Sequence, residues 1–121
     1  MTDTFAIRLP WPEAPLHPNA RVGRRQVIAA ERRARVAAFR AAEEQITLPS
    51  SQAHLRLIFY PPDRRRRDMT NMVAATKSYL DGIVAAAGVA PSDWSYLIQR
   101  GQVVFRGCVI IRITNERPPP T

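Results

Sequence analysis

Prolines restrict the possible folds of this chain more than any other residue, because they divide it into short segments. One group interrupts residues 9–21, which are therefore expected to form an extended loop instead of a helix or a central strand. Pro61 and Pro62 end a second segment, and a third group stands near the end of the sequence. The first group consists of Pro10, Pro12, Pro15 and Pro18.

Two segments between the prolines favour helices. Residues 24–44 are rich in alanine and contain neither proline nor glycine, which predicts a helix of about five turns. A second helix is expected from Asp68, a good N-cap, to Ala87, where Gly88 is a natural stop. Its expected buried stripe consists of Met69, Val73, Thr76, Leu80, Ile83 and Ala87.

Alternating or apolar runs predict strands at residues 4–9 and 54–60. A last pair of strands is expected at about 97–105 and 108–114, with a turn at Arg106-Gly107. The order of elements is then β, long loop, α, β, α, β, β. We therefore predict one α/β (α+β) domain over residues 1–116, with a mixed sheet and two main helices. Residues 117–121 are expected to be a disordered proline tail.

The charge of the chain points to a nucleic-acid partner. The formal net charge is +8 over 121 residues, the pI is about 11.2, and 17 of the 18 basic residues are arginine. Arginine matches the geometry of phosphate, although solvated surface arginines would give the same composition. A single cysteine, Cys108, excludes a disulfide within the chain. No apolar run is long enough to cross a membrane, so we expect a cytoplasmic protein with no membrane partner.

The strongest local feature is the run Arg64, Arg65, Arg66 and Arg67, which stands between a strand and a helix. Four adjacent cations repel one another, so phosphate is an attractive counter-charge, although an exposed basic turn would carry the same residues. We also expect Arg21, Arg24 and Arg25 to contact nucleic acid.

Two acidic residues are placed to serve a nuclease. Asp68 and Asp93 belong to different elements, and a nuclease needs such carboxylates to converge on Mg²⁺. The structural alternatives are a helix cap for Asp68 and a turn residue for Asp93.

The stretch from Arg67-Asp68-Met69-Thr70-Asn71 to Ser92-Asp93 resembles the RusA-like family of Holliday junction resolvases. It also includes Lys77, Asp81 and the turn Ala87-Gly88-Val89. The resemblance extends more weakly to about residues 9–113. Many members of that family are encoded by phages and prophages.

The resemblance implies a homodimer that grips a four-way DNA junction and cuts it with Mg²⁺, one cut per subunit. Asp68 and Asp93 would bind the metal, Asn71 would orient the site, and Lys77 would contact phosphate or support charge in the transition state.

Two positions depart from the family pattern. Thr70 stands where a further aspartate ligand is expected, and Ser92 replaces the first residue of an Asp-Asp pair. A hydroxyl brings no charge to a Mg²⁺ site. The change therefore predicts either a protein that binds junctions without cutting them or a rearranged site, for example one that uses Mn²⁺.

On one continuous helix, Thr70, Lys77 and Asp81 would lie within about 40° of one another. Asp81 would lie ~20 Å along the axis from Asp68, too far to share its metal. We therefore expect Asp81 to pair with an arginine or to contact the partner in a dimer.

Three functions stay open from the sequence. The first is a Mg²⁺-dependent endodeoxyribonuclease that resolves branched DNA in recombination and repair. The second is a catalytically weakened junction-binding protein on the same fold, and the third is an unrelated basic RNA-binding or assembly protein.

Overall fold

The computed structural model describes residues 4–45, 53–88 and 94–114 of the chain. This part is a single small domain with a four-stranded mixed sheet, as the α/β (α+β) prediction required. The strands are β1 (Thr4–Pro10), β2 (His54–Tyr60), β3 (Ser95–Arg100) and β4 (Cys108–Thr114). The helices are α1 (Arg24–Glu43), α2 (Met69–Ala75), α3 (Lys77–Ala87) and a short 3-10 turn, η1 (Ala14–Leu16). The expected proline tail lies outside the described residues.

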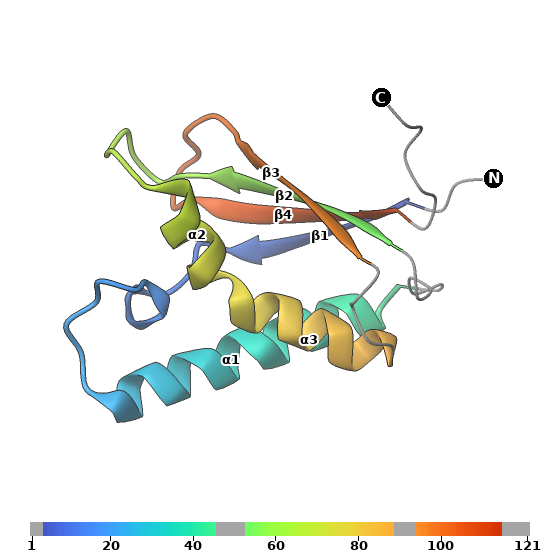
Figure 1. Cartoon of the computed structure of the whole chain (residues 1–121), viewed down its shortest axis with the longest axis horizontal. Helices are drawn as coiled ribbons and strands as arrows, with labels where there is room; N and C mark the ends of the chain where they lie inside the picture. Colours follow the sequence, from blue (N-terminus) through green and yellow to red (C-terminus); the bar gives the residue numbers. More distant parts are fainter. Residues whose placement is uncertain (1–3, 46–52, 89–93, 115–121) are drawn as a thin grey trace.

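The helices lie on one face of the sheet (Figure 1). The strand order is β1-β4-β2-β3. β4 runs antiparallel to both β1 and β2, whereas β3 runs parallel to β2. The last two strands therefore do not pair with each other, although they follow one another in the sequence.

The third strand is shorter than predicted and ends at Arg100 instead of 105. The next residue, Gly101, lies so close to the Tyr60 ring that an added Cβ would be 2.5 Å from it. From there the chain follows the end of β2, and the Val104 amide donates to the Pro61 carbonyl at 2.9 Å. The predicted turn at Arg106-Gly107 is confirmed, since both residues have positive φ.

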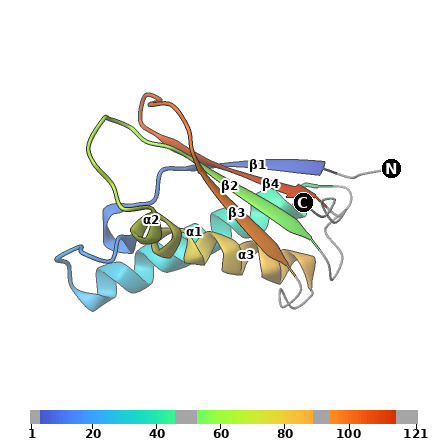
Figure 2. The same ribbon diagram turned by 45° about the horizontal axis from the view of Figure 1, so that its top comes forward.

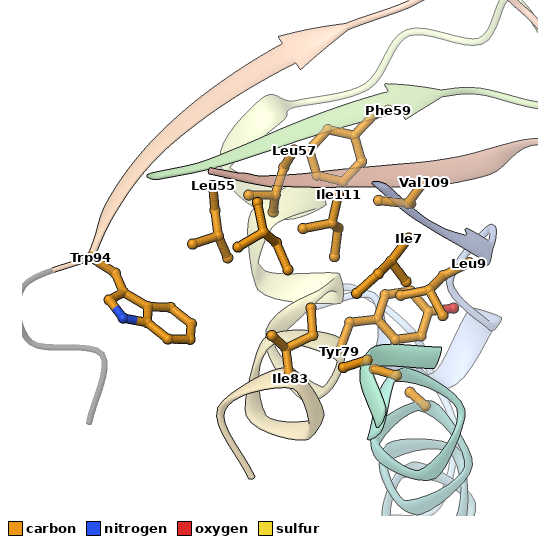
Figure 3. Packing of buried hydrophobic residues seen from close by; sticks show 14 of the residues in the cluster. Ile7, Leu9, Leu55, Leu57, Phe59, Tyr79, Ile83, Trp94, Val109 and Ile111 are labelled. Atoms are coloured by element: carbon orange, nitrogen blue, oxygen red, sulfur yellow. The ribbon is translucent and has the colours of Figure 1, made fainter. Parts of the chain in front are cut away.

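The core lies between the sheet and the helices, as Figure 3 shows. Alternate residues of three adjacent strands face the helices, which is the period-2 pattern of a sheet with one buried face. Burial of these side chains removes apolar surface from water and is the main stabilising contribution. They are Ile7 and Leu9 of β1, Leu55, Leu57 and Phe59 of β2, and Val109, Ile111 and Ile113 of β4.

Small residues let α1 and α3 approach closely. Ala30, Ala34, Ala38 and Ala42 form the buried face of α1. An ideal Cβ at Gly82 of α3 would lie 2.3 Å from the Arg35 carbonyl oxygen and 3.0 Å from the Ala38 Cβ. Only glycine fits at this crossing.

The predicted helix over 68–87 is wrong in one respect, because it is broken at Thr76. The Thr76 hydroxyl donates to the Val73 carbonyl at 2.9 Å, and the Thr76 amide donates to the same oxygen at 3.1 Å. Thr76 has φ −101° and ψ 4°, which is outside the helical region. A side-chain bond to a nearby carbonyl competes with the helix in this way.

The buried face of this segment differs from the predicted stripe. Thr76 and Ile83 are buried as predicted, but the other four predicted residues are not fully buried: Met69, Val73, Leu80 and Ala87. The buried positions are taken instead by Met72, Tyr79 and Gly82. The end signals of the segment are confirmed, with Asp68 as N-cap and Gly88 in the left-handed region at φ 70°.

Two contacts attach the proline-rich segment to the helices. The Tyr79 hydroxyl donates to the Pro10 carbonyl at 2.7 Å. Burial, with a smaller contribution from the Glu13 charge, raises the pKa of Tyr79 to about 12, so this donor stays protonated at neutral pH. Arg33 of α1 holds both carboxylate oxygens of Glu13, at 2.8 and 3.0 Å. Within the described ranges, no helix is both long and apolar enough to cross a membrane.

Candidate nucleic-acid interface

The arginine run lies on the basic loop, defined as residues 61–67, which joins β2 to the N-cap of α2. Pro61 and Pro62 end β2, and the Asp63 side chain accepts a hydrogen bond from the Arg65 amide at 2.9 Å. This local bond forms a tight turn. It is also the largest of the interactions that lower the pKa of Asp63, so this carboxylate is charged at neutral pH.

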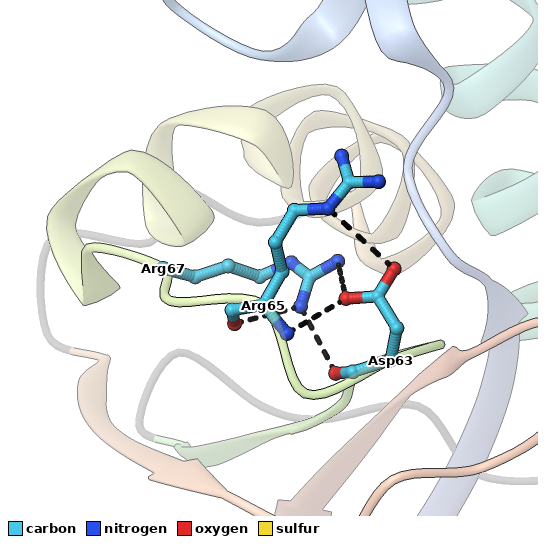
Figure 4. Close-up of polar contacts among 3 residues, drawn as sticks. All are labelled: Asp63, Arg65 and Arg67. Carbon is cyan, nitrogen blue, oxygen red and sulfur yellow. Dashed lines mark hydrogen bonds and ion pairs between the residues drawn. The ribbon is translucent and has the colours of Figure 1, made fainter.

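Arg67 differs from the other three arginines because it binds the loop itself (Figure 4). Its Nη2 lies 2.9 Å from Asp63 Oδ1, and its Nη1 donates to the Asp63 and Arg65 carbonyls at 3.2 and 3.1 Å. The guanidinium carbon lies 5.2 Å from the centre of the Trp11 ring, which in turn contacts Phe59 edge-on. Its side chain is only 15% exposed. Arg67 therefore fixes the loop against the end of the sheet.

Arg64, Arg65 and Arg66 are exposed. The nearest acidic contact among them is loose, at 3.9 Å between Arg65 Nε and Asp63 Oδ2, and the Arg65 side chain is 82% exposed. An exposed pair at this distance contributes little to stability. Three cations therefore stand on a loop that Arg67 holds in place.

Arg21, Arg24 and Arg25, which were expected to contact nucleic acid, stand at or just before the start of α1. Both views place the start of α1 and the basic loop at the same end of the molecule (Figures 1 and 2). Arg21, Arg24 and Arg25 are exposed. The first turn of α1 contains no acidic residue, although the positive end of a helix dipole favours acids there. We call the six exposed arginines the basic end: Arg21, Arg24, Arg25, Arg64, Arg65 and Arg66.

Asp68 caps α2 beside the basic loop. Its Oδ1 accepts a hydrogen bond from the Thr70 amide at 2.8 Å and a second one from the Thr70 hydroxyl. These two bonds, the hydroxyl first, hold the pKa of Asp68 below its ordinary value. Thr70, which stands where the family pattern has a second carboxylate, therefore donates a hydrogen bond to the Asp68 carboxylate.

Lys77 and Asp81 pair with each other and not with Asp68. Lys77 Nζ lies 3.3 Å from Asp81 Oδ2, so the expected arginine partner of Asp81 is a lysine. The two residues belong to α3, beyond the break at Thr76, whereas Thr70 and the half-buried Asn71 belong to α2. The single stripe predicted for Thr70, Lys77 and Asp81 assumed one continuous helix, whereas the helix is interrupted at Thr76, between Thr70 and the other two residues.

Comparison with known proteins identifies a relative of this chain. No protein-family model matches the chain. An uncharacterized protein of Xylella fastidiosa (strain Temecula1 / ATCC 700964) is 37% identical over 116 residues, which cover 91% of this chain and 76% of that protein. The chain belongs to the family of this Xylella protein. The Xylella relative carries no described activity, so function has to be argued from the residues themselves.

The candidate metal ligands lie only partly in the described part of the chain. No group of three or more histidine, cysteine, aspartate or glutamate side chains gathers in the part that the structure describes. Asp68 is placed beside the basic loop, but Oδ1 is already bound to Thr70. Asp93 and Ser92 lie outside the described residues, so the pairing of Asp68 with Asp93 stays a prediction.

Proposed function

We propose that this protein binds DNA through the basic end, and that it prefers four-way junctions to linear duplex. The observation that carries the proposal is the basic loop, in which one largely buried arginine fixes three exposed ones. Arg67 directs its hydrogen bonds to the loop, while Arg64, Arg65 and Arg66 remain exposed to a ligand.

Phosphate suits these side chains for physical reasons. Duplex DNA carries one negative charge per ~1.7 Å of axis, and arginine binds phosphate with two parallel hydrogen bonds. A fixed loop loses less conformational entropy on binding than a free one. The repulsion among the three arginines is relieved when phosphates lie between them. The arginines at the start of α1 add positive charge at the same end of the molecule.

The preference for a branched substrate and the homodimer rest on the RusA-like resemblance. Two copies of the basic end, related by a two-fold axis, would face different arms of a junction. An isolated duplex offers one arm, so it would engage fewer arginines. On the same grounds we propose that the protein acts on DNA in the cytoplasm.

Cleavage with Mg²⁺ or Mn²⁺ is the second candidate function. Asp68 favours it, because this carboxylate is exposed, charged at neutral pH and adjacent to the arginines. Thr70 favours the opposite outcome, a protein that holds junctions without cutting them, because it brings no negative charge to the position where the family pattern has a carboxylate. Because Asp93 and Ser92 lie outside the described residues, none of these side chains is assigned to a cleavage step.

The test uses a labelled four-way junction and a linear duplex with the same arm sequence, each with Mg²⁺, Mn²⁺ or EDTA. Tight binding to the junction in EDTA supports the proposal. Symmetric metal-dependent nicks, lost in Asp68→Asn, would add the nuclease. Equal affinity for both DNAs would contradict the junction preference and favour a general RNA-binding or assembly role.

A further inference from the structure

The sheet has a second face that no described helix covers (Figure 2). Because side chains alternate along a strand, the residues between the core positions of β1, β4 and β2 point to this side. We call this surface the open face, and define it by Arg8, Arg56, Ile58, Ile110 and Arg112. It is separate from the basic loop, which follows the end of β2.

Two arginines stand directly opposite each other on the open face. Arg56 of β2 and Arg112 of β4 are register partners, and Arg8 of β1 lies diagonally across from Arg112. All three side chains are exposed. Opposite partners on a sheet face are ~5 Å apart and diagonal ones ~7–8 Å. The three arginines thus form a row about 12 Å long across adjacent strands.

This row is electrostatically unfavourable in the free protein. Like charges directly opposite on a sheet repel, and within the described ranges none of the three arginines forms an ion pair or a side-chain hydrogen bond. The four strands contain no acidic residue at all. The described acidic residues lie instead on helices and loops: Glu13, Glu31, Glu43, Glu44, Asp63, Asp68 and Asp81.

We infer that the open face is a second nucleic-acid surface, on which Arg8, Arg56 and Arg112 bind the phosphate backbone of a DNA arm. The inference rests on the proposed DNA-binding function and adds a contact that the sequence motifs do not contain. Charge complementarity selects the partner, because the row is cationic, pairs with no acidic side chain among the described residues and is long enough to meet several phosphates of a duplex. The next register pair on this face, Ile58 and Ile110, is apolar.

The test compares two variants that lose the same charge. Arg56→Gln/Arg112→Gln removes the opposed pair, and Arg32→Gln/Arg35→Gln removes two exposed arginines of α1 in the helical layer. Affinity for the labelled junction is measured by fluorescence anisotropy over a range of salt concentrations, and the melting temperature of each protein is measured in parallel.

The open-face variant is expected to bind the junction about tenfold more weakly, with a salt slope reduced by about two. Its melting temperature should rise by about 1–4 °C, because repulsion is removed. The α1 variant should keep the wild-type salt slope. Loss of binding together with a gain in stability is a result that a merely structural role would not produce.

An unchanged salt slope in the open-face variant would overturn the inference while leaving the proposed function intact. A lower melting temperature with unchanged affinity would also overturn it, and would show that these arginines only cover Ile58 and Ile110. Failure of the wild-type protein to bind any DNA would refute the proposed function, and this inference with it.

Discussion

Substitution of Gly82 by alanine tests the packing that positions the whole helical layer. A Cβ at this position would lie 2.3 Å from the Arg35 carbonyl oxygen and 3.0 Å from the Phe39 amide nitrogen. Both are backbone atoms of α1, so neither can rotate away. The new methyl group fits only if α3 moves away from α1 by roughly 1 Å, which loosens a close-packed interface.

The magnitude follows from two opposing effects. Overpacking of a well-packed interface costs about 1–3 kcal/mol, whereas alanine favours a helix over glycine by about 1 kcal/mol. Because the 2.3 Å contact is with a backbone atom, the overpacking cost is expected in the upper part of this range, about 2–3 kcal/mol, so Gly82→Ala should lower the free energy of unfolding by about 1–2 kcal/mol. Urea denaturation followed by circular dichroism measures this difference.

Ala85→Gly is the matched control, since Ala85 is exposed on the same helix. It makes the reverse exchange without touching α1, and it should cost about 1 kcal/mol from helix propensity alone. A Gly82→Ala protein as stable as the wild type, or more stable, would refute the close crossing of α1 and α3.

Three further predictions concern single side chains. Tyr79→Phe should lower the free energy of unfolding by about 0.5–1.5 kcal/mol in urea, because the hydrogen bond from the Tyr79 hydroxyl to the Pro10 carbonyl is lost; an equal midpoint would exclude that bond. Arg67→Ala should lower the free energy of unfolding by about 2–3 kcal/mol. Arg65→Ala, at an exposed position, should change it by less than about 0.5 kcal/mol. Equal effects of the two substitutions would show that Arg67 does not fix the basic loop. Thr70→Val should raise the pKa of Asp68 towards its ordinary value in an NMR titration. The stability contributed by this carboxylate is present above about pH 4 and lost as the pH falls through its depressed pKa, so wild type and variant should converge in acid and differ most at neutral pH.

Local sequence signals predicted most of the elements. The alanine-rich segment and the alternating run after Ala53 became α1 and β2 with nearly the expected bounds. Asp68 and Gly88 marked the two ends of the next helical segment, because each acts through its own backbone or side chain. Such signals are local, so they can be read without knowledge of the fold.

The errors have a non-local or competing cause. Thr76 breaks the second helix through a hydroxyl bond that a helix pattern does not reveal. The place of β4 between β1 and β2 depends on pairing between residues about 100 positions apart, and no turn signal encodes it.

The four arginines of the run were predicted as one unit, whereas in the structure Arg67 has a different role from its three neighbours. Four arginines looked equivalent in the sequence, but Arg67 contacts Trp11, which is far away in the chain. The spacing of four between Asp63 and Arg67 was the available signal for their ion pair. The opposed pair Arg56 and Arg112 depends on strand register, which the sequence alone does not provide.

The central claim, DNA binding by the basic end, is tested most directly by the salt dependence of junction affinity in Arg64→Gln/Arg65→Gln/Arg66→Gln. Arg32→Gln/Arg35→Gln/Arg40→Gln carries the same net charge and serves as the control. We predict that the loop variant loses about three units of salt slope and at least about tenfold in affinity, while the control keeps the slope of the wild type. Identical slopes for the loop variant, the control and the wild type would contradict it.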